Sequence, residues 1–185
     1  LDTTFKICPT TGTGLGAFGT KDIGKMCCVL RETSYFVIWK PEEEIPPEDV
    51  EAKFAHFQSR FKELFLSLIN SEDQSFTSRI VEFVKGSFST CGQGTHLVCL
   101  RFNHSCVPNT IVLLPSDGSK CGLEIYTIQP VAMGKELNFS YDSNSDYLTD
   151  KQQQTVRTGD FTCKRPACNP NNAFHYVSDM RCTLL

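Results

Sequence analysis

The rest of the chain can be interpreted from one stretch, Arg101-Phe102-Asn103-His104-Ser105-Cys106-Val107-Pro108-Asn109. It offers an amide, an imidazole, a hydroxyl and a thiol within four residues. Apolar runs lie on both sides, at 98–102 and 110–114, and their β-branched and aromatic side chains predict strands. A dense polar group between two strands is typical of a ligand site or of a polar turn.

Three interpretations of this stretch are open on chemistry alone. Cys106 and His104 could form a nucleophile pair, although residues two apart rarely give a productive Cys–His hydrogen bond. Asn103 and His104 could instead hold a polar ligand while Cys106 binds a metal. The third interpretation is a polar turn whose histidine has its hydrogen-bond partners within the protein.

Two more segments carry candidate chemistry. Gly14-Leu15-Gly16 has alternate glycines, which allow unusual backbone angles and close approach to a ligand. It lacks the third glycine of a dinucleotide-binding loop, and a plain turn is the commoner interpretation. Tyr141 ends a strand-like run that begins after Gly134. Its hydroxyl could bond a carbonyl or orient an amine in a site.

The remaining pattern predicts an α+β chain. Further strands are expected at 27–30, 35–39 and 123–128, and a turn at 116–119 predicts a hairpin between 110–114 and 123–128. A second helix is expected at about 75–84. The first helix is predicted by seven apolar residues at helical spacing: Val50, Phe54, Phe57, Phe61, Leu64, Phe65 and Leu68.

Composition narrows the class of protein. The 185 residues fit one domain, and a net charge of -3 without a basic run predicts no direct nucleic-acid binding. No apolar run approaches 18 residues, so no membrane span is expected. Ten cysteines, with Cys27 and Cys28 adjacent in an apolar run, do not resemble a secreted disulfide framework. We therefore expect the protein in the nucleus or cytoplasm.

The order of the three segments resembles the SET-domain protein-lysine methyltransferases. The resemblance covers about residues 5 to 168 and is closest to the MYND-linked and fungal branch, without a MYND finger in this chain. It implies small β-sheets with a knot-like C-terminal thread, a helical insert and a short cysteine-bearing tail. The halves of the SET domain would be 1–40 and 89–150, the insert 41–88 and the tail 151–185.

The resemblance also implies an activity, the transfer of methyl groups from S-adenosylmethionine to a lysine side chain of a protein substrate, histone or non-histone. Tyr141 matches the catalytic tyrosine. Phe139 matches a substrate-channel residue, and a phenylalanine there favours di- or trimethylation. The positions that match donor-binding residues are Gly14, Leu15, Gly16, Asn103, His104, Tyr141 and Phe161.

The resemblance leaves open whether the chain binds zinc. Cys106, Cys163 and Cys168 match three zinc ligands, but Arg165 stands where relatives have a further cysteine. A structural zinc ion needs four ligands. Cys182 or His175 could supply the fourth; otherwise the thiols are free.

Departures from the family pattern keep a second class of function open. Thr13, Lys135 and Arg165 differ from the residues that relatives often have. A SET-like module that binds a partner without catalysis, or a fold used for another small-molecule reaction, is therefore the alternative. The expected partner of an active enzyme is a protein with an exposed lysine, with no membrane involved.

Overall fold

The computed structural model describes residues 3–10, 14–40, 44–67, 93–113, 115, 122–141, 169 and 171–174. The chain divides into two compact units. The first comprises Leu1–Cys27, Phe102–Ile111 and Tyr126–Leu185, and the second comprises Cys28–Arg101 and Val112–Ile125. None of the helices in the described part of the chain has the length and apolar character needed to cross a membrane.

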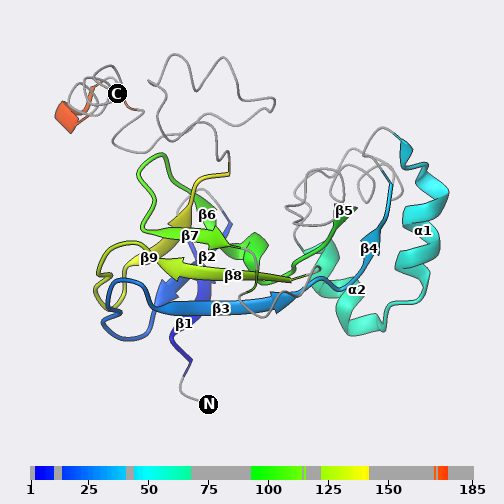
Figure 1. The fold of residues 1–185 in the computed structure, drawn as a ribbon, viewed down its shortest axis with the longest axis horizontal. Coiled ribbons are helices and arrows are strands. Elements are labelled where there is room, and N and C mark those ends of the chain that lie inside the picture. The colour runs from blue at the N-terminus through cyan, green and yellow to red at the C-terminus, as the bar shows by residue number, and fades with distance from the viewer. Residues whose placement is uncertain are drawn as a thin grey trace. The chain divides into compact units, whose positions relative to one another are not determined.

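The first unit contains a four-stranded sheet in the order β1-β2-β9-β6 (Figure 1). Its strands are β1 (Phe5–Pro9), β2 (Leu15–Gly19), β6 (Asn103–His104) and β9 (Glu136–Phe139). β1 pairs antiparallel with β2, and β2 pairs antiparallel with β9. β6 pairs parallel with β9, with Asn103 opposite Asn138. The sheet thus joins three segments that are far apart in sequence.

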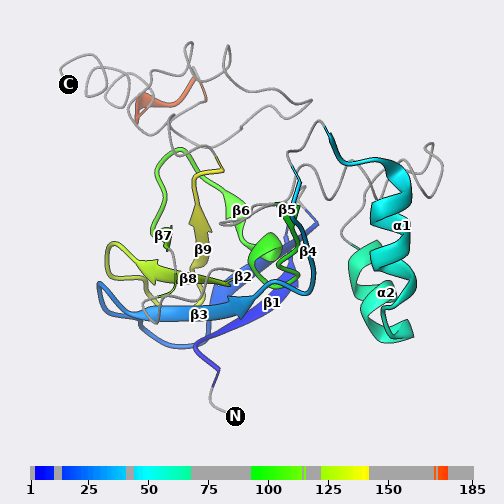
Figure 2. The ribbon, with the colours of Figure 1, turned by 45° about the vertical axis from the view of Figure 1, so that its right-hand side comes forward.

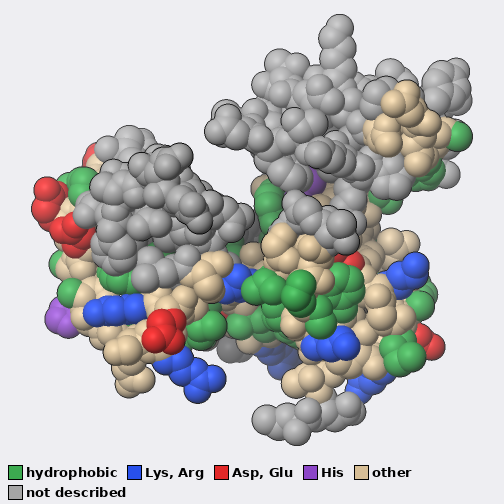
Figure 3. Space-filling model, turned by 180° about the vertical axis from the view of Figure 1, so that it is seen from behind, with side chains coloured by type: hydrophobic (Ala, Val, Ile, Leu, Met, Phe, Trp, Pro, Cys, Tyr) green, Lys and Arg blue, Asp and Glu red, His purple; other side chains and the backbone are tan. Residues whose placement is uncertain are grey.

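Apolar side chains from these segments form the core of the first unit. Ala17, Phe102 and Leu137 are fully buried, and the ring of Phe5 lies edge-on to Phe102 at 5.1 Å. Ile7 of β1 keeps 37% of its surface exposed. Figure 3 shows hydrophobic side chains gathered beside lysine and arginine side chains on the face seen from behind.

Most of a three-stranded sheet, in the order β3-β8-β7, belongs to the second unit. Its strands are β3 (Cys28–Thr33), β7 (Thr110–Leu113) and β8 (Gly122–Thr127). β7 and β8 are neighbours, as the expected hairpin requires, while its turn at 116–119 lies outside the described residues. β4 (Val37–Ile38) and β5 (Gln93–Gly94) form a separate antiparallel pair.

The expected single helix is wrong in one respect, because the apolar stripe is divided between two helices, α1 (Pro47–Ala55) and α2 (Ser59–Leu66). Gln58 takes an extended conformation with ψ 150°, which ends helical continuity between them. The helices lie side by side in both ribbon views (Figures 1 and 2), and the rings of Phe54 and Phe65 lie 5.2 Å apart.

The core of the second unit combines residues of this stripe with apolar residues from outside it. Its buried members are Phe36, Ile38, Ile45, Val50, Phe54, Phe65 and Leu97, with Phe57 and Phe61 packed against them. Leu64, placed on the stripe by spacing, is 44% exposed, because the break at Gln58 changes the face that α2 buries. Leu68 and the helix expected at about 75–84 lie outside the described residues.

The strand expected at 98–102 is also wrong. Residues Cys99–Arg101 form a 3-10 helix, η2, closed by the Arg101 N–H donating to the Val98 carbonyl at 3.0 Å. The described elements are small mixed sheets with few helices, which confirms the expected α+β class. The knot-like thread and the four-part division of the chain stay predictions.

Candidate functional site

The sheet of the first unit brings together the three segments that the sequence singled out. Gly16 lies on β2, Asn103 and His104 form β6, and Phe139 ends β9, with Tyr141 two residues later. β9 lies between β2 and β6 in the sheet. The candidate site is therefore centred on β9, and its described members all belong to one unit.

The glycine loop has two different environments. Gly14 has φ +74°, and a Cβ added to it would meet no heavy atom within 4 Å. A Cβ on Gly16 would lie 2.7 Å from Glu136 Oε1 and 2.9 Å from Asn103 Nδ2. At Gly14 the positive φ would strain any residue with a side chain, although the space beside it is open. At Gly16 the absence of a side chain permits close packing within the protein.

Asn103 connects this loop to β9. Its Nδ2 donates to the Leu15 carbonyl at 3.1 Å and to Glu136 Oε1 at 2.7 Å. Both amide hydrogens are thus used within the protein. The side chain thus holds the glycine loop against β9, and Oδ1 is the atom with which Asn103 would bind the expected methyl donor.

His104 and Cys106, a pair that is rarely in hydrogen-bond contact at this spacing, lie within hydrogen-bond distance here. His104 Nε2 lies 3.1 Å from Cys106 Sγ, and His104 Nδ1 accepts the Tyr141 N–H at 3.2 Å. The turn after β6 folds the thiol back toward the buried ring, which an extended strand would not allow. Because Nδ1 accepts a hydrogen bond, we infer that the proton of the neutral ring is on Nε2, facing the sulfur.

Tyr141 lies close to the Asn103–His104 pair. Its hydroxyl donates to the Phe102 carbonyl at 3.1 Å. Its ring lies 5.4 Å from that of His104 and 5.3 Å from that of Phe139. The side chain of Tyr141 is 56% exposed, whereas Phe139 is 4% exposed. The Tyr141 hydroxyl is therefore held in place next to the buried Phe139 ring. Since Tyr141 is exposed on one side, it can face a bound ligand.

The remaining predicted site residues, Phe161, Cys163 and Cys168, lie outside the described residues. Within the part of the chain that the structure describes, no group of three or more His, Cys, Asp or Glu side chains could hold a metal ion. Cys106 is half-buried. The predicted zinc ligands stay a prediction.

Two further residues contact the centre of the site. They are Asn109, which no sequence pattern singled out, and Glu136, which the family resemblance implies is structural and takes no part in the reaction. Asn109 Nδ2 donates to the Glu136 carbonyl at 2.8 Å, and its Oδ1 accepts the Asn138 N–H at 2.9 Å. The only signal for Asn109 was its place at the end of the polar stretch. The Asn103–Glu136 bond joins residues 33 apart, and no local pattern predicts such a pair.

Glu32, in the second unit, was also missed. Its carboxylate accepts the N–H of Val98 at 2.9 Å and that of Cys99 at 2.8 Å, at the start of η2. Burial raises the pKa of Glu32, although these bonds oppose the shift. Burial, and next the charge of Glu32, raise the pKa of the Cys99 thiol. Cys99 is therefore a buried neutral thiol.

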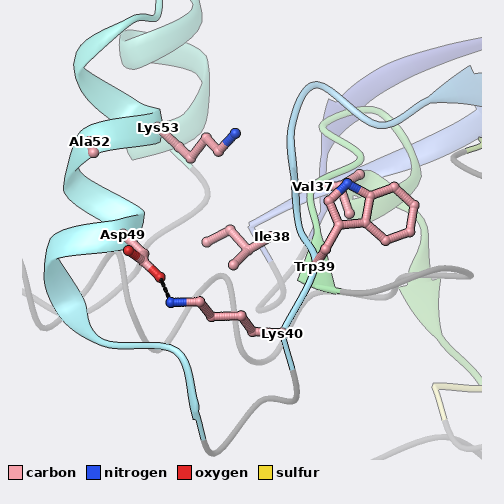
Figure 4. A pocket seen from close by; sticks show the side chains of 7 residues that line it. All are labelled: Val37, Ile38, Trp39, Lys40, Asp49, Ala52 and Lys53. Atoms are coloured by element: carbon pink, nitrogen blue, oxygen red, sulfur yellow. Dashed lines mark hydrogen bonds and ion pairs between the residues drawn. The ribbon is translucent and has the colours of Figure 1, made fainter.

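A separate pocket of about 320 Å³ lies in the second unit between β4 and α1 (Figure 4). Lys40 Nζ forms an ion pair with Asp49 Oδ2 at 2.6 Å in this pocket. Its lining residues are Val37, Ile38, Trp39, Lys40, Asp49, Ala52 and Lys53. None of these is a predicted site residue.

Comparison with known families identifies the family of this chain. The model of the SET domain family matches residues 14–142, well over half of the chain. The chain belongs to the SET domain family.

Individual proteins are similar over parts of the chain. A SET and MYND domain-containing protein of Dictyostelium discoideum is 27% identical over 84 residues, which cover 45% of this chain. The match covers 24% of that relative, so the chain corresponds to about a quarter of its length. The expected family, and the likeness to its MYND-linked members, are confirmed.

Two solved structures are also similar. One is a Plasmodium falciparum protein described as a candidate histone methyltransferase, with a TM-score of 0.43 and 17% identity, covering 77% of this chain and 96% of that chain. The other is the Neurospora SET domain protein DIM-5, a histone lysine methyltransferase, with a TM-score of 0.41 and 19% identity, covering 75% and 52%.

Proposed function

We propose that this protein transfers methyl groups from S-adenosylmethionine to a lysine side chain of a protein substrate. Membership of the SET domain family supports protein methyltransferase activity in general. The observation that carries the proposal is the convergence of Gly14–Gly16, Asn103–His104 and Tyr141 on one sheet, with the Tyr141 hydroxyl bonded to the carbonyl that precedes Asn103.

The residues present fit a sulfonium donor. The space beside Gly14 leaves room for a ligand along the loop, and Tyr141 is half-exposed beside the Asn103–His104 pair. S-adenosylmethionine, when bound, supplies an electrophilic methyl group on a positively charged sulfur. Oxygen atoms suit such a cation, because they stabilise its charge and accept weak C–H hydrogen bonds.

Tyr141 is the residue to which we assign the catalytic role. Since its hydroxyl hydrogen is directed to the Phe102 carbonyl, its oxygen lone pairs are directed elsewhere and can accept contacts from a methyl group or an amine. The His104 ring holds the Tyr141 backbone through Nδ1, so hydroxyl and backbone are both fixed. A fixed acceptor lowers the cost of reaching the reactive geometry.

The substrate amine must be neutral to react. Free lysine has a pKa near 10.4, so about one amine in 2,500 is neutral at about pH 7. Apolar walls disfavour the ammonium form and lower that pKa. Phe139, buried and packed against Tyr141, supplies one such wall. Because it carries no hydroxyl that would narrow the channel, we propose di- or trimethylation.

Donor binding is tested first, by calorimetric titration with S-adenosylmethionine. We expect binding to the wild type and marked loss in Asn103→Ala, because that change frees Leu15 and Glu136 from each other. Gln129→Ala, an exposed change on a neighbouring loop, is the control and should bind normally. A wild-type protein that does not bind the donor would favour the non-catalytic module instead.

Turnover is tested with radiolabelled donor and a cell extract as the source of protein substrates. Tyr141→Phe should lower methyl transfer roughly 100-fold, with little change in donor affinity, because it removes one preorganised hydroxyl. Tyr35→Phe makes the same chemical change at a tyrosine that stacks on Phe61 and should leave transfer unchanged. Equal transfer by Tyr141→Phe and the wild type would remove Tyr141 from the mechanism.

A further inference from the structure

The position of the proposed catalytic residues depends on the register of β9. On the β6 side, the ladder has only two residue pairs, Asn103 with Asn138 and His104 with Phe139. Side chains alternate along a strand, so a slip of one residue would exchange the faces of Asn138 and Phe139. Phe139 would then leave the Tyr141 ring. A ladder this short needs another contact to fix its register.

Asn109 supplies that contact with its side-chain amide. Nδ2 donates to the Glu136 carbonyl at 2.8 Å, and Oδ1 accepts the Asn138 N–H at 2.9 Å. The amide group thus pairs with β9 as the backbone of a neighbouring strand would. The amide group offers one donor and one acceptor at a fixed spacing. It can therefore pair with β9 only at a backbone carbonyl that is followed, two residues later, by an available N–H on the same edge of the strand.

Backbone bonds hold Asn109 and Asn138 in place. Asn138 O accepts the Asn109 N–H at 3.2 Å and the Thr110 hydroxyl at 2.9 Å, while Asn109 O accepts the Ile128 N–H at 2.9 Å. Asn138 Oδ1 is buried and has no hydrogen-bond partner among the residues that the structure describes. An unsatisfied buried acceptor is unfavourable, so the bonds to its backbone, rather than its side chain, keep Asn138 at this position.

We propose that Asn109 is a positioning residue that fixes the register of β9 and, through it, the Phe139 ring and the Tyr141 hydroxyl. The side-chain hydrogen bonds of Asn109 go to Glu136 and Asn138. Asn109 therefore acts on Tyr141 through the strand that leads to it. The catalytic consequence rests on the proposed methyl transfer, whereas the structural effect does not.

Amide hydrogen exchange, followed by NMR, tests the structural effect in Asn109→Ala. Exchange at Asn138 and at Tyr141, whose N–H bonds His104 Nδ1, should rise about tenfold or more. Gly19, whose N–H bonds Lys135 O on the β2 side, should stay protected. Gln129→Ala, which removes a long bond to the Pro108 carbonyl in the same segment, is the matched control and should change none of these amides.

Asn109→Asp gives the same comparison if the alanine variant does not fold. The carboxylate can still accept the Asn138 N–H but cannot donate to the Glu136 carbonyl. Since one of the two side-chain bonds from residue 109 to β9 remains, Asn138 should keep part of its protection, and exchange at Tyr141 should rise less than the loss of both bonds would cause. In either variant, unchanged exchange at Tyr141 would overturn the proposal, because Asn109 would then act only locally.

Kinetics test the catalytic consequence. Asn109→Ala should lower kcat about tenfold or more, with little change in the Kd for S-adenosylmethionine, because it displaces a reacting group and leaves the donor loop intact. An active wild type and an equally active variant would overturn the positioning role. If the wild type neither binds the donor nor transfers methyl groups, the proposed function fails, and the exchange data still decide whether Asn109 fixes the register.

Discussion

At the scale of single residues, the site depends on close packing around Gly16. A Cβ at this position would lie within 2.7 Å of Glu136 Oε1 and of Thr10 Cγ2, and 2.9 Å from Asn103 Nδ2. Two of these atoms form the hydrogen bond that joins β6 to β9. The glycine is therefore required by the protein's own side chains, apart from any ligand.

Gly16→Ala should consequently lower the free energy of unfolding by about 1–3 kcal/mol, the usual effect of overpacking, and should weaken donor binding. Gly24→Ala is the control, because its Cβ would meet only Cys27 Sγ, at 3.5 Å. Urea denaturation measures the first effect and calorimetry the second. Equal free energies of unfolding for the Gly16 and Gly24 variants would contradict this prediction. They would show that Asn103 and Glu136 can shift to admit the methyl group without loss of stability.

At the scale of elements, η2 shows how a side chain can override strand propensity. The run 98–102 has strand-like composition, but the Glu32 carboxylate accepts two consecutive backbone N–H groups there. Consecutive N–H groups that face one acceptor suit a helical turn and not a strand, in which they point in opposite directions. The turn then ends directly before Phe102 and Asn103.

The raised pKa of Glu32 predicts a particular pH dependence of stability. Since the folded pKa lies above the ordinary value of 4.5, the folded protein binds this proton more readily than the unfolded chain. The resulting stabilisation is complete below about pH 4.5 and is lost as the pH rises through the raised pKa. Unfolding by urea at a series of pH values should show this loss in the wild type.

Glu32→Gln should remove that part of the pH dependence, because the amide does not titrate. The difference in unfolding free energy between wild type and variant should therefore change as the pH rises above about 4.5 and then level off. Glu63→Gln, a change on exposed α2 surface, controls for the substitution itself. If the free energy of unfolding varied with pH in the same way in the wild type and in Glu32→Gln, the assignment of the raised pKa to Glu32 would be contradicted.

At the scale of the whole molecule, the two units are interleaved along the chain. The chain passes from one unit to the other after Cys27, Arg101, Ile111 and Ile125. β7 and β8 each contain residues of both units. Two units that share strands and several connections are expected to unfold as one cooperative system.

Phe54→Ala tests this expectation. Phe54 is buried in the core of the second unit, and its removal should lower the free energy of unfolding by about 3–5 kcal/mol. In a cooperative molecule, the most protected amides of β9 in the first unit should lose as much protection as those of α2. Loss confined to α2, measured by hydrogen exchange, would show that the units unfold separately.

Local patterns in the sequence determined the elements and the family. Apolar runs rich in β-branched residues predicted β7 and β8, and helical spacing predicted the apolar stripe that α1 and α2 divide between them. The order of the glycine, Asn-His and tyrosine segments predicted the SET domain. Each strand or helix signal spans only a few residues, where backbone geometry sets which side chains share a face.

Only the tertiary structure decided the contacts that make the site. The bonds of Asn103 to Leu15, Asn109 to Glu136, and Glu32 to Val98 join residues 88, 27 and 66 positions apart. Each depends on the tertiary fold, because local backbone geometry does not bring these residues together. A residue's type states what it can bond but not which distant partner the fold will bring to it. For that reason the roles of Asn109 and Glu32, and the bond of Glu136 to Asn103, were not apparent from sequence.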